Sequence, residues 1–200
     1  MRALISSAGE LRRQLRFVPN QLTATRLALI PVLWALALTG HTFWVGIGLA
    51  LAFLTDAADG FAARRFGQTS PFGSKFDSIV DGLLAPSVLA WLVLLSPAAL
   101  FDNEALAAAW LATTYASIGL GLIRFRRFAN LHLYSAKVAA VAQYAFVTHA
   151  FIAGAYLPVL FDCAVGFGIL ASAESLMLQL VLDRVHERHG SLIHALGRAR

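Results

Sequence analysis

Residues 55–82 read TDAADGFAARRFGQTSPFGSKFDSIVDG, and they decide the fold because they place acids beside lipid-soluble sequence. The apolar run FWVGIGLALAFL (43–54) precedes them, and LLAPSVLAWLVLL (83–95) follows. An ionisable side chain at the centre of a membrane helix costs about 2.5–3.5 kcal/mol on insertion scales. The acids of this stretch therefore need a compensating partner, which makes them candidates for a functional site. They are Asp56, Asp59, Asp77 and Asp81.

The composition of the whole chain is that of a membrane protein. Of its 200 residues, 58% are hydrophobic and 14% are charged, which is more apolar than a soluble domain. Six stretches reach the length of about 20 residues that a helix needs to cross a bilayer. We therefore predict an all-α membrane protein with six transmembrane helices. The expected spans are 21–39, 43–62, 77–99, 105–125, 136–156 and 159–182.

The basic residues predict the orientation in the membrane. All 16 lysines and arginines fall into four clusters, at 2–26, 64–75, 124–137 and 184–200. The connectors TGHT, SPAALFDNEA and AYLPVLFD contain none. Because positive charge favours the cytoplasmic side, both termini and the two basic loops are expected there, in a bacterial inner membrane. This distribution favours membrane lipids over nucleic acid as the partner of the basic charge.

The chain divides into three expected parts. Residues 1–17 show apolar side chains at helical spacing with basic residues on other faces, which predicts a short N-terminal interfacial helix. Residues 18–183 form the six-helix domain, in which Val18-Pro19-Asn20 marks the start of the first membrane helix. Residues 184–200 form a cytoplasmic basic tail. The small-residue stretch ASIGLG (116–121) suits close helix packing, and we expect a homodimer.

Helical geometry gathers the acids onto two faces. If the second span continues through DAADGFAAR, one arc of about 140° holds Asp56, Asp59, Gly60, Ala63 and Arg64. Gly73, Asp77 and Asp81 follow at intervals of four and share a second face. The short loop RFGQTSPFG can turn the two faces toward each other. The four carboxylates would then line one cleft, about 10 Å beneath the cytoplasmic surface of the bilayer core.

Clustered carboxylates repel one another unless some are protonated or a cation lies between them. Oxygen-only ligands suit Mg²⁺ or Mn²⁺, and there is no nearby Cys or His cluster of the kind that binds structural zinc. Two divalent ions bridged by carboxylates serve displacement at phosphorus, because the metals neutralise both the phosphate and the leaving group. The leading hypothesis is therefore phosphoryl-type transfer with two Mg²⁺ or Mn²⁺ ions.

The spacing Asp56-x-x-Asp59-Gly60-x-x-Ala63-Arg64, eight residues, Gly73-x-x-x-Asp77-x-x-x-Asp81 resembles the signature of the CDP-alcohol phosphotransferases at every defined position. PNQLTATRLALIP (19–31) also looks like the opening of the family's first helix, which lies by the nucleotide. The resemblance implies transfer of a phosphatidyl group from CDP-diacylglycerol to a small polar alcohol, with release of CMP.

The resemblance also implies roles for single residues. Asp56, Asp59 and Asp77 would ligate the metals, and Asp81 would complete the metal site and act as the base that deprotonates the acceptor. Asp77 and Asp81 are thus the expected catalytic residues. The expected donor-binding residues are Asn20, Thr23, Gly60, Ala63, Arg64, Gly73 and Ser74. Arg124 and Lys137 either bind a phosphate of the substrates or serve only topology and lipid contact.

The acceptor and two rival functions remain open. YSAKVAAVAQYAF and DSIVDGLL depart from the patterns GK-x-KT and DPVADK of phosphatidylglycerophosphate synthases, which weakens an assignment of glycerol phosphate as the acceptor. Inositol phosphate, serine, choline and other alcohols stay open. A transporter or cation pathway also places acids within spans, but the outer halves of the second and third spans are uninterrupted apolar sequence. An inactive scaffold with the same fold is disfavoured by the complete acid set. Glu174, inside the sixth span, needs a partner of its own.

Overall fold

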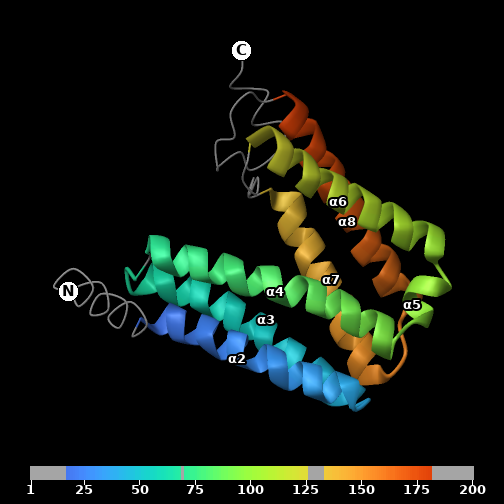
Figure 1. Cartoon of the computed structure of the whole chain (residues 1–200), viewed down its shortest axis with the longest axis horizontal. Coiled ribbons are helices and arrows are strands. Elements are labelled where there is room, and N and C mark those ends of the chain that lie inside the picture. The colour runs from blue at the N-terminus through green and yellow to red at the C-terminus, as the bar shows by residue number, and fades with distance from the viewer. Residues whose placement is uncertain (1–16, 69, 126–132, 182–200) are drawn as a thin grey trace. The chain divides into compact units, whose positions relative to one another are not determined.

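The computed structural model describes residues 17–68, 70–125 and 133–181. These residues form helices and no strands (Figure 1). The helices are α2 (Val18–Leu38), α3 (Thr42–Arg65), α4 (Pro71–Leu95), α5 (Ala98–Phe101), α6 (Glu104–Phe125), α7 (Tyr134–Ala153) and α8 (Pro158–Val181). The all-α prediction is confirmed. The expected N-terminal interfacial helix and the basic tail lie outside the described residues, apart from Phe17.

Within the described ranges, six helices are long and apolar enough to cross a membrane, namely α2, α3, α4, α6, α7 and α8. This confirms the predicted class of a six-span membrane protein. Their bounds follow the expected spans closely except for the third, which was predicted at 77–99 and is observed at Pro71–Leu95.

The earlier start of α4 has a local cause. Ser70 is the N-cap, and its hydroxyl accepts a hydrogen bond from the backbone N–H of Gly73 at 3.0 Å. Pro71 occupies the first helical turn, where its fixed φ is favourable. The end of the expected loop RFGQTSPFG is therefore helical, and Gly73 belongs to the first turn of α4. At the other end, Ser96 precedes Pro97, which disfavours further helix.

The start of α2 confirms part of the prediction. The helix begins at Val18 with Pro19 in its first turn, but the N-cap is Phe17, which makes no side-chain cap. Asn20 is therefore not a cap: it lies inside the helix and is buried. The backbone N–H of Val18 donates to Oε1 of Gln68 at 3.0 Å. This bond ties the start of α2 to the segment that connects α3 and α4.

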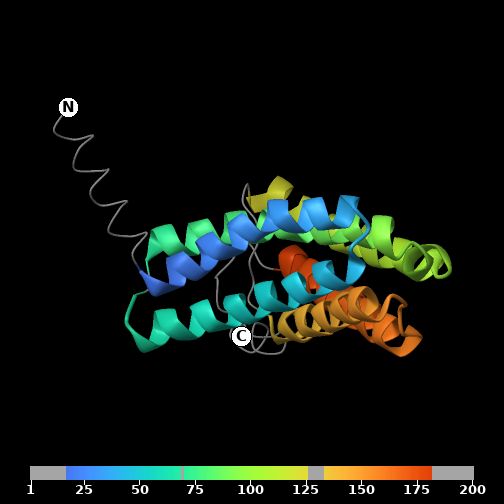
Figure 2. The ribbon, with the colours of Figure 1, turned by 90° about the horizontal axis from the view of Figure 1, so that it is seen from below.

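The described helices belong to two compact units. The first contains residues up to Ser96 together with Phe151–Gly154, and the second contains the rest. In the first unit α2 packs against both α3 and α4, as the two ribbon views show (Figures 1 and 2). Trp34 of α2 fastens the contact with α4: its Nε1–H donates to the Ser87 hydroxyl at 3.0 Å, and its ring meets Trp91 edge to face.

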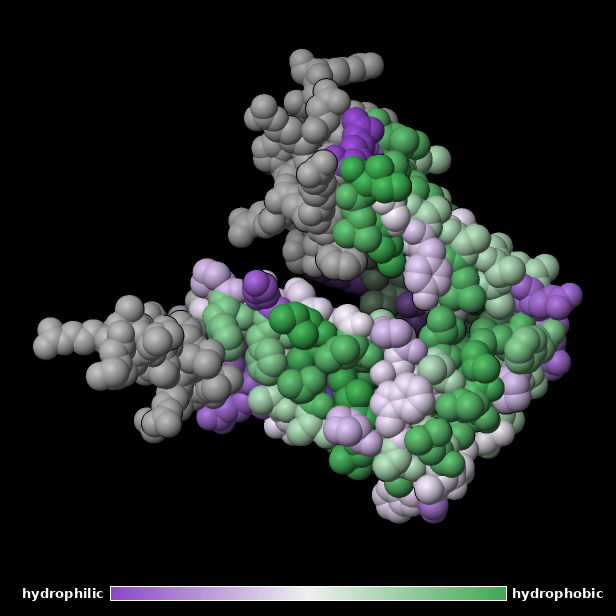
Figure 3. Space-filling model, in the orientation of Figure 1, coloured by the Kyte–Doolittle hydropathy of each residue, from purple (hydrophilic) through white to green (hydrophobic). Residues whose placement is uncertain are grey.

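The outward surface of the first unit is apolar along its length. Hydrophobic residues cover much of the face seen in Figure 3. Exposed side chains include Val32, Leu54, Leu83 and Leu94, each about half exposed. Large apolar surfaces of this kind mark contact with a membrane or a partner, which agrees with transmembrane helices surrounded by lipid.

The second unit is joined by polar contacts between α6 and α8. The Ser117 hydroxyl donates to the Ser175 hydroxyl at 2.9 Å, and Gln179 Nε2–H₂ donates to both. Glu174 of α8 accepts a hydrogen bond from the Ser135 hydroxyl of α7 at 2.5 Å. This bond provides the partner expected for an acid inside a membrane span. Such bonds satisfy polar groups that would otherwise be costly within a membrane bundle.

Candidate active site

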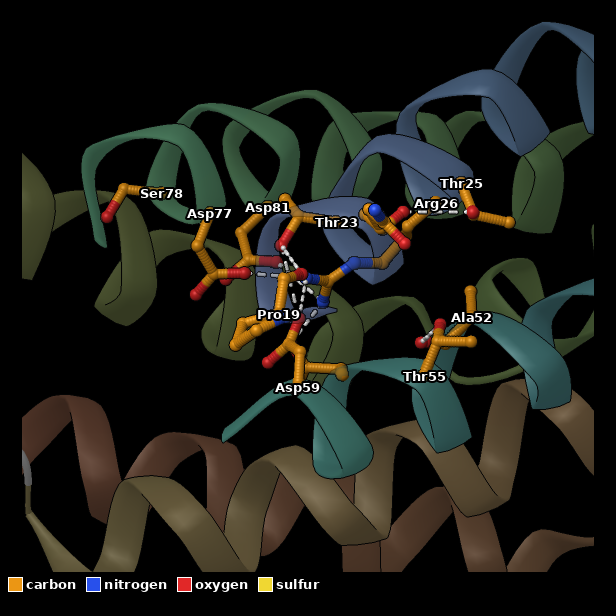
Figure 4. A network of polar contacts seen from close by, with 12 residues as sticks. Pro19, Thr23, Thr25, Arg26, Ala52, Thr55, Asp59, Asp77, Ser78 and Asp81 are labelled. Carbon is orange, nitrogen blue, oxygen red and sulfur yellow. Dashed lines mark hydrogen bonds and ion pairs between the residues drawn. The ribbon is translucent and has the colours of Figure 1, made fainter. Parts of the chain in front are cut away.

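A buried arginine contacts all four predicted aspartates, and Figure 4 labels it with three of them, Asp59, Asp77 and Asp81. Arg26 comes from α2, and its side chain is only 1% exposed. Its Nη1–H₂ donates to Asp56 Oδ1 and, at 3.4 Å, to Asp81 Oδ1. Its Nη2–H₂ donates to Asp59 Oδ2 at 2.9 Å and to Asp77 Oδ1 at 2.5 Å. One side chain thus forms ion pairs with all four carboxylates.

The helices place these groups for simple reasons. Asp56 and Asp59 lie three residues apart on α3, and Asp77 and Asp81 lie four apart on α4, so each pair shares a helix face. Both faces turn toward α2, which packs against α3 and α4. The structure therefore brings together the four acids that the spacing singled out, and the two faces meet through Arg26.

The four aspartate side chains differ in their exposure to solvent. The Asp59 side chain is 11% exposed and lies deepest, where its Oδ2 also faces the Thr23 hydroxyl at 3.3 Å. Asp77 and Asp56 are 38% and 41% exposed. Asp81 is 54% exposed and has the longest contact with Arg26. Asp59 is thus the anchored member of the cluster, and Asp81 is the one most open to a reacting group.

The sequence reasoning missed Arg26, because it grouped this residue with the cytoplasmic basic charges. A signal was available. Arg26 lies in the apolar span TATRLALIP with no acid three or four residues away on its own helix. An intramembrane charge of this kind marks a functional site by default and requires a partner from another helix.

The acids can also hold a metal ion. Asp56, Asp59 and Asp77 each offer one carboxylate oxygen, and these three oxygens lie within 4.8 Å of one another. Hard oxygen donors in a small cluster suit Mg²⁺ or Mn²⁺. The four carboxylates outnumber the one guanidinium that contacts them, which favours an additional cation in the cluster. Asp81 is not a member of this group among the described residues.

The predicted donor-binding residues lie at the same end of the first unit. Thr23 and Asn20 are buried on α2, and Gly60 lies on α3 beside Asp59. Ala63 and Arg64 belong to the last turns of α3, but their side chains are outside the described part of the structure. Ser74 has an exposed side chain, and its backbone N–H donates to the Ser70 carbonyl at 3.1 Å.

The side chain of Asn20, on α2, lies close to Gly73. A Cβ atom on Gly73 would lie 2.7 Å from Asn20 Oδ1 and 3.2 Å from Ser70 Oγ. Gly73→Ala therefore requires the Asn20 side chain to move, and because Asn20 is buried we expect the free energy of unfolding to fall by about 1–3 kcal/mol. Thermal unfolding of the purified protein measures this effect.

Gly82→Ala is the matched control for Gly73→Ala. Gly82 lies on the same helix, and nothing lies within 4 Å of its added Cβ. Alanine in an open helical position is neutral or stabilising relative to glycine. Equal unfolding temperatures for the two variants would contradict the steric role of Gly73.

The predicted acceptor residues belong to the second unit. Arg124 Nη1–H₂ donates to the Leu180 carbonyl at 3.0 Å. The Lys137 ammonium lies 5.6 Å from the centre of the Tyr134 ring. The contacts of Arg124 and Lys137 are with residues of the second unit. Phosphate binding by these two residues stays a prediction. The homodimer likewise stays a prediction: within ASIGLG, Ser117 contacts α8.

The fold and the site define an integral membrane protein with a carboxylate cluster that can bind a divalent metal. The sequence profile of the CDP-alcohol phosphatidyltransferase family matches residues 16–180. This match covers most of the chain, and the chain therefore belongs to the CDP-alcohol phosphatidyltransferase family.

Curated relatives match over shorter stretches. The CDP-diacylglycerol--glycerol-3-phosphate 3-phosphatidyltransferase of Rickettsia typhi is 35% identical over 79 residues, which are 38% of this chain and 44% of that protein. The human cardiolipin synthase (CMP-forming) is 44% identical over 69 residues, 34% of this chain and 23% of that protein. The matched part thus spans less than half the length of either relative. No solved structure gives a significant match.

Proposed function

We propose that this chain is an integral membrane phosphatidyltransferase of phospholipid synthesis. It transfers the phosphatidyl group of CDP-diacylglycerol to the hydroxyl of a small polar alcohol and releases CMP. The observation that carries the proposal is the group of Asp56, Asp59 and Asp77, whose oxygens lie within 4.8 Å of one another. They belong to a chain of the CDP-alcohol phosphatidyltransferase family.

The reaction exchanges a phosphoanhydride bond of the donor for a phosphoester bond of the product. The acceptor oxygen forms a bond to the phosphorus that bears diacylglycerol, the bond from that phosphorus to CMP breaks, and the acceptor loses a proton. Asp56, Asp59 and Asp77 hold the divalent ions, for which we propose two Mg²⁺ or Mn²⁺. When bound, these ions neutralise the diphosphate and the charge that develops on the leaving CMP.

Asp81 takes the proton of the acceptor hydroxyl. It is the most exposed of the four carboxylates and has the longest contact with Arg26, 3.4 Å. Both properties favour a group that must meet a substrate and accept a proton. Its neighbour Asp77, one turn earlier on α4, contacts Arg26 at 2.5 Å and belongs to the metal-binding group instead.

The donor is held at the same end of the first unit. Asn20, Thr23 and Ser74 offer polar groups to the nucleotide, Gly60, Gly73 and Ala63 keep the wall small, and Arg64 pairs with the diphosphate. The distribution of basic residues supports an active site that faces the cytoplasm, with both termini on that side of a bacterial inner membrane. A homodimer completes the proposed assembly.

The acceptor is a small alcohol whose identity the motifs leave open. One relative is named for transfer to glycerol 3-phosphate, and another is named as a cardiolipin synthase. The departure of DSIVDGLL (77–84) from DPVADK weighs against glycerol 3-phosphate. Glycerol 3-phosphate, inositol phosphate, serine and choline are therefore the small alcohols to compare, and the lipid alcohol phosphatidylglycerol is the comparison that would contradict a small acceptor.

The test incubates the purified chain with CDP-diacylglycerol, Mg²⁺ or Mn²⁺ and each acceptor in turn. We expect CMP release that depends on one acceptor and on the metal, together with a new phospholipid of matching mass. A folded preparation that releases no CMP with any acceptor would contradict the proposal. Uptake of Mn²⁺ into vesicles without CMP release would instead support the transporter hypothesis.

A further inference from the structure

The Arg26 guanidinium is surrounded by negative charge, but its hydrogen bonds are incomplete. Its guanidinium contacts four carboxylates, each through a single oxygen. Its Nε–H is buried and has no hydrogen-bond partner among the described residues. An arginine binds a carboxylate best through two parallel bonds, and a buried donor without a partner is unfavourable. The guanidinium therefore holds the acids together without being fully satisfied by them.

Arg26 and a divalent cation draw on the same groups. Asp56, Asp59 and Asp77 pair with Arg26, and the same three can hold an ion. The guanidinium carries one positive charge and the ion carries two. Since the cluster has an excess of negative charge, a divalent ion compensates it better than the guanidinium does.

We propose that Arg26 is the built-in counter-cation of the metal-free cluster and gives up its carboxylates when a divalent ion binds. Arg26 thereby sets the affinity for the ion: it stabilises the metal-free chain and competes with metal binding. This inference rests on the proposed function for the kind of cation, a resident Mg²⁺ or Mn²⁺. It assigns to Arg26 a role in positioning and in metal affinity, and no chemical step.

The proposal makes two measured quantities move in opposite directions. Without Arg26 the four carboxylates repel one another, so the metal-free chain should unfold at a lower temperature. The ion no longer displaces a guanidinium, so its affinity should rise. If Arg26 served only to scaffold the acids, its loss would lower both the stability and the metal affinity.

The experiment uses the full chain in detergent, with Mn²⁺ as the probe. Calorimetric titration gives the Mn²⁺ Kd, and thermal unfolding in EDTA gives the stability of the metal-free protein. For Arg26→Gln we expect a lower unfolding temperature in EDTA and a Kd about tenfold lower than in the unmodified chain, which corresponds to about 1.4 kcal/mol. Weaker or unchanged Mn²⁺ binding would overturn the proposal.

Lys75→Gln is the matched control. It also removes one positive charge from the first unit, at an exposed position near the start of α4. Lys75 lies near the site, two residues before Asp77, but it is exposed and forms no ion pair with the four aspartates in the described part of the chain. A solvated charge of this kind contributes little, so the Mn²⁺ Kd of Lys75→Gln should stay within about twofold of that of the unmodified chain. An equal rise in affinity in Lys75→Gln and Arg26→Gln would show a general charge effect and overturn the role of Arg26.

Arg26→Lys tests the same proposal if Arg26→Gln does not fold. Lysine keeps the charge but offers a compact ammonium in place of the fork, so it should hold fewer carboxylates and bind Mn²⁺ more tightly than arginine does. Weaker Mn²⁺ binding in this variant would overturn the proposal. CMP release by the unmodified chain separates the two proposals. If the unmodified chain releases no CMP but the Arg26 variant binds Mn²⁺ more tightly, only the proposed function is wrong. If the unmodified chain releases CMP but the Arg26 variant binds Mn²⁺ more weakly, only the role of Arg26 is wrong.

Discussion

Asp77→Asn is expected to lower the rate of CMP release from CDP-diacylglycerol by about 10²- to 10³-fold and to weaken Mn²⁺ binding. Losses of this size follow when one preorganised electrostatic group is removed from an active site. Asp77 is one of the three acids whose oxygens lie within 4.8 Å of one another, and it contacts Arg26 at 2.5 Å. Its neutral amide would offer the ion a weaker ligand and one charge less.

The loss of CMP release in Asp77→Asn should not come from unfolding of the variant. The cluster has more carboxylates than positive charges, so the removal of one should leave the stability of the metal-free chain unchanged or raise it. Thermal unfolding in EDTA checks this point, and calorimetric titration with Mn²⁺ checks the affinity. Asp162→Asn, at an exposed position of α8, is the control. Wild-type turnover in Asp77→Asn would remove this residue from the metal site.

Asp81→Asn is expected to separate binding from chemistry. Asparagine cannot accept the proton of the acceptor hydroxyl, and general-base catalysis contributes about 10²- to 10⁴-fold, so CMP release should fall by that factor. Mn²⁺ affinity should change by only a few-fold, because Asp81 lies outside the metal-binding group of Asp56, Asp59 and Asp77. The Mn²⁺ Kd and the rate of CMP release at saturating Mn²⁺ measure the two effects.

The result for Asp81→Asn distinguishes a base from a ligand. If Mn²⁺ affinity drops as far as in Asp77→Asn, Asp81 is a metal ligand, and the loss of CMP release no longer supports a role as base. Full CMP release in this variant would contradict both roles. Ser78→Ala is a suitable control, because Ser78 is exposed on the same helix between the two acids and its hydroxyl donates to the Ser74 carbonyl.

The helices and the clustering of the four acids could be predicted from the sequence, because both depend on local patterns. Span length and hydropathy predict transmembrane helices, and intervals of three and four place Asp56 with Asp59 and Asp77 with Asp81 on shared faces. The early start of α4 was also readable, since Ser70-Pro71 is a strong helix-start signal. That signal was outweighed by the apolar run, which begins several residues later.

The role of Arg26 could not be read from local patterns. It lies 30 residues from Asp56 and 55 from Asp81 along the chain. Their meeting depends on α2 packing against both α3 and α4, which is a property of three helices together. The close approach of Asn20 to Gly73 has the same origin, so the sequence could mark each residue as special without showing what it touches.

The partnership of Arg26 with acids from later helices has a consequence for biogenesis. During synthesis α2 emerges before α3 and α4, and it carries its arginine toward the bilayer before Asp56, Asp59, Asp77 and Asp81 have been made. Asp56 follows 30 residues later, on the next helix. An unpaired arginine disfavours the insertion of a lone helix by about 2.5–3.5 kcal/mol at the bilayer centre. The favourable route is therefore entry of α2 and α3 as one hairpin, already joined by their ion pairs, with α4 added to a partly neutralised pair.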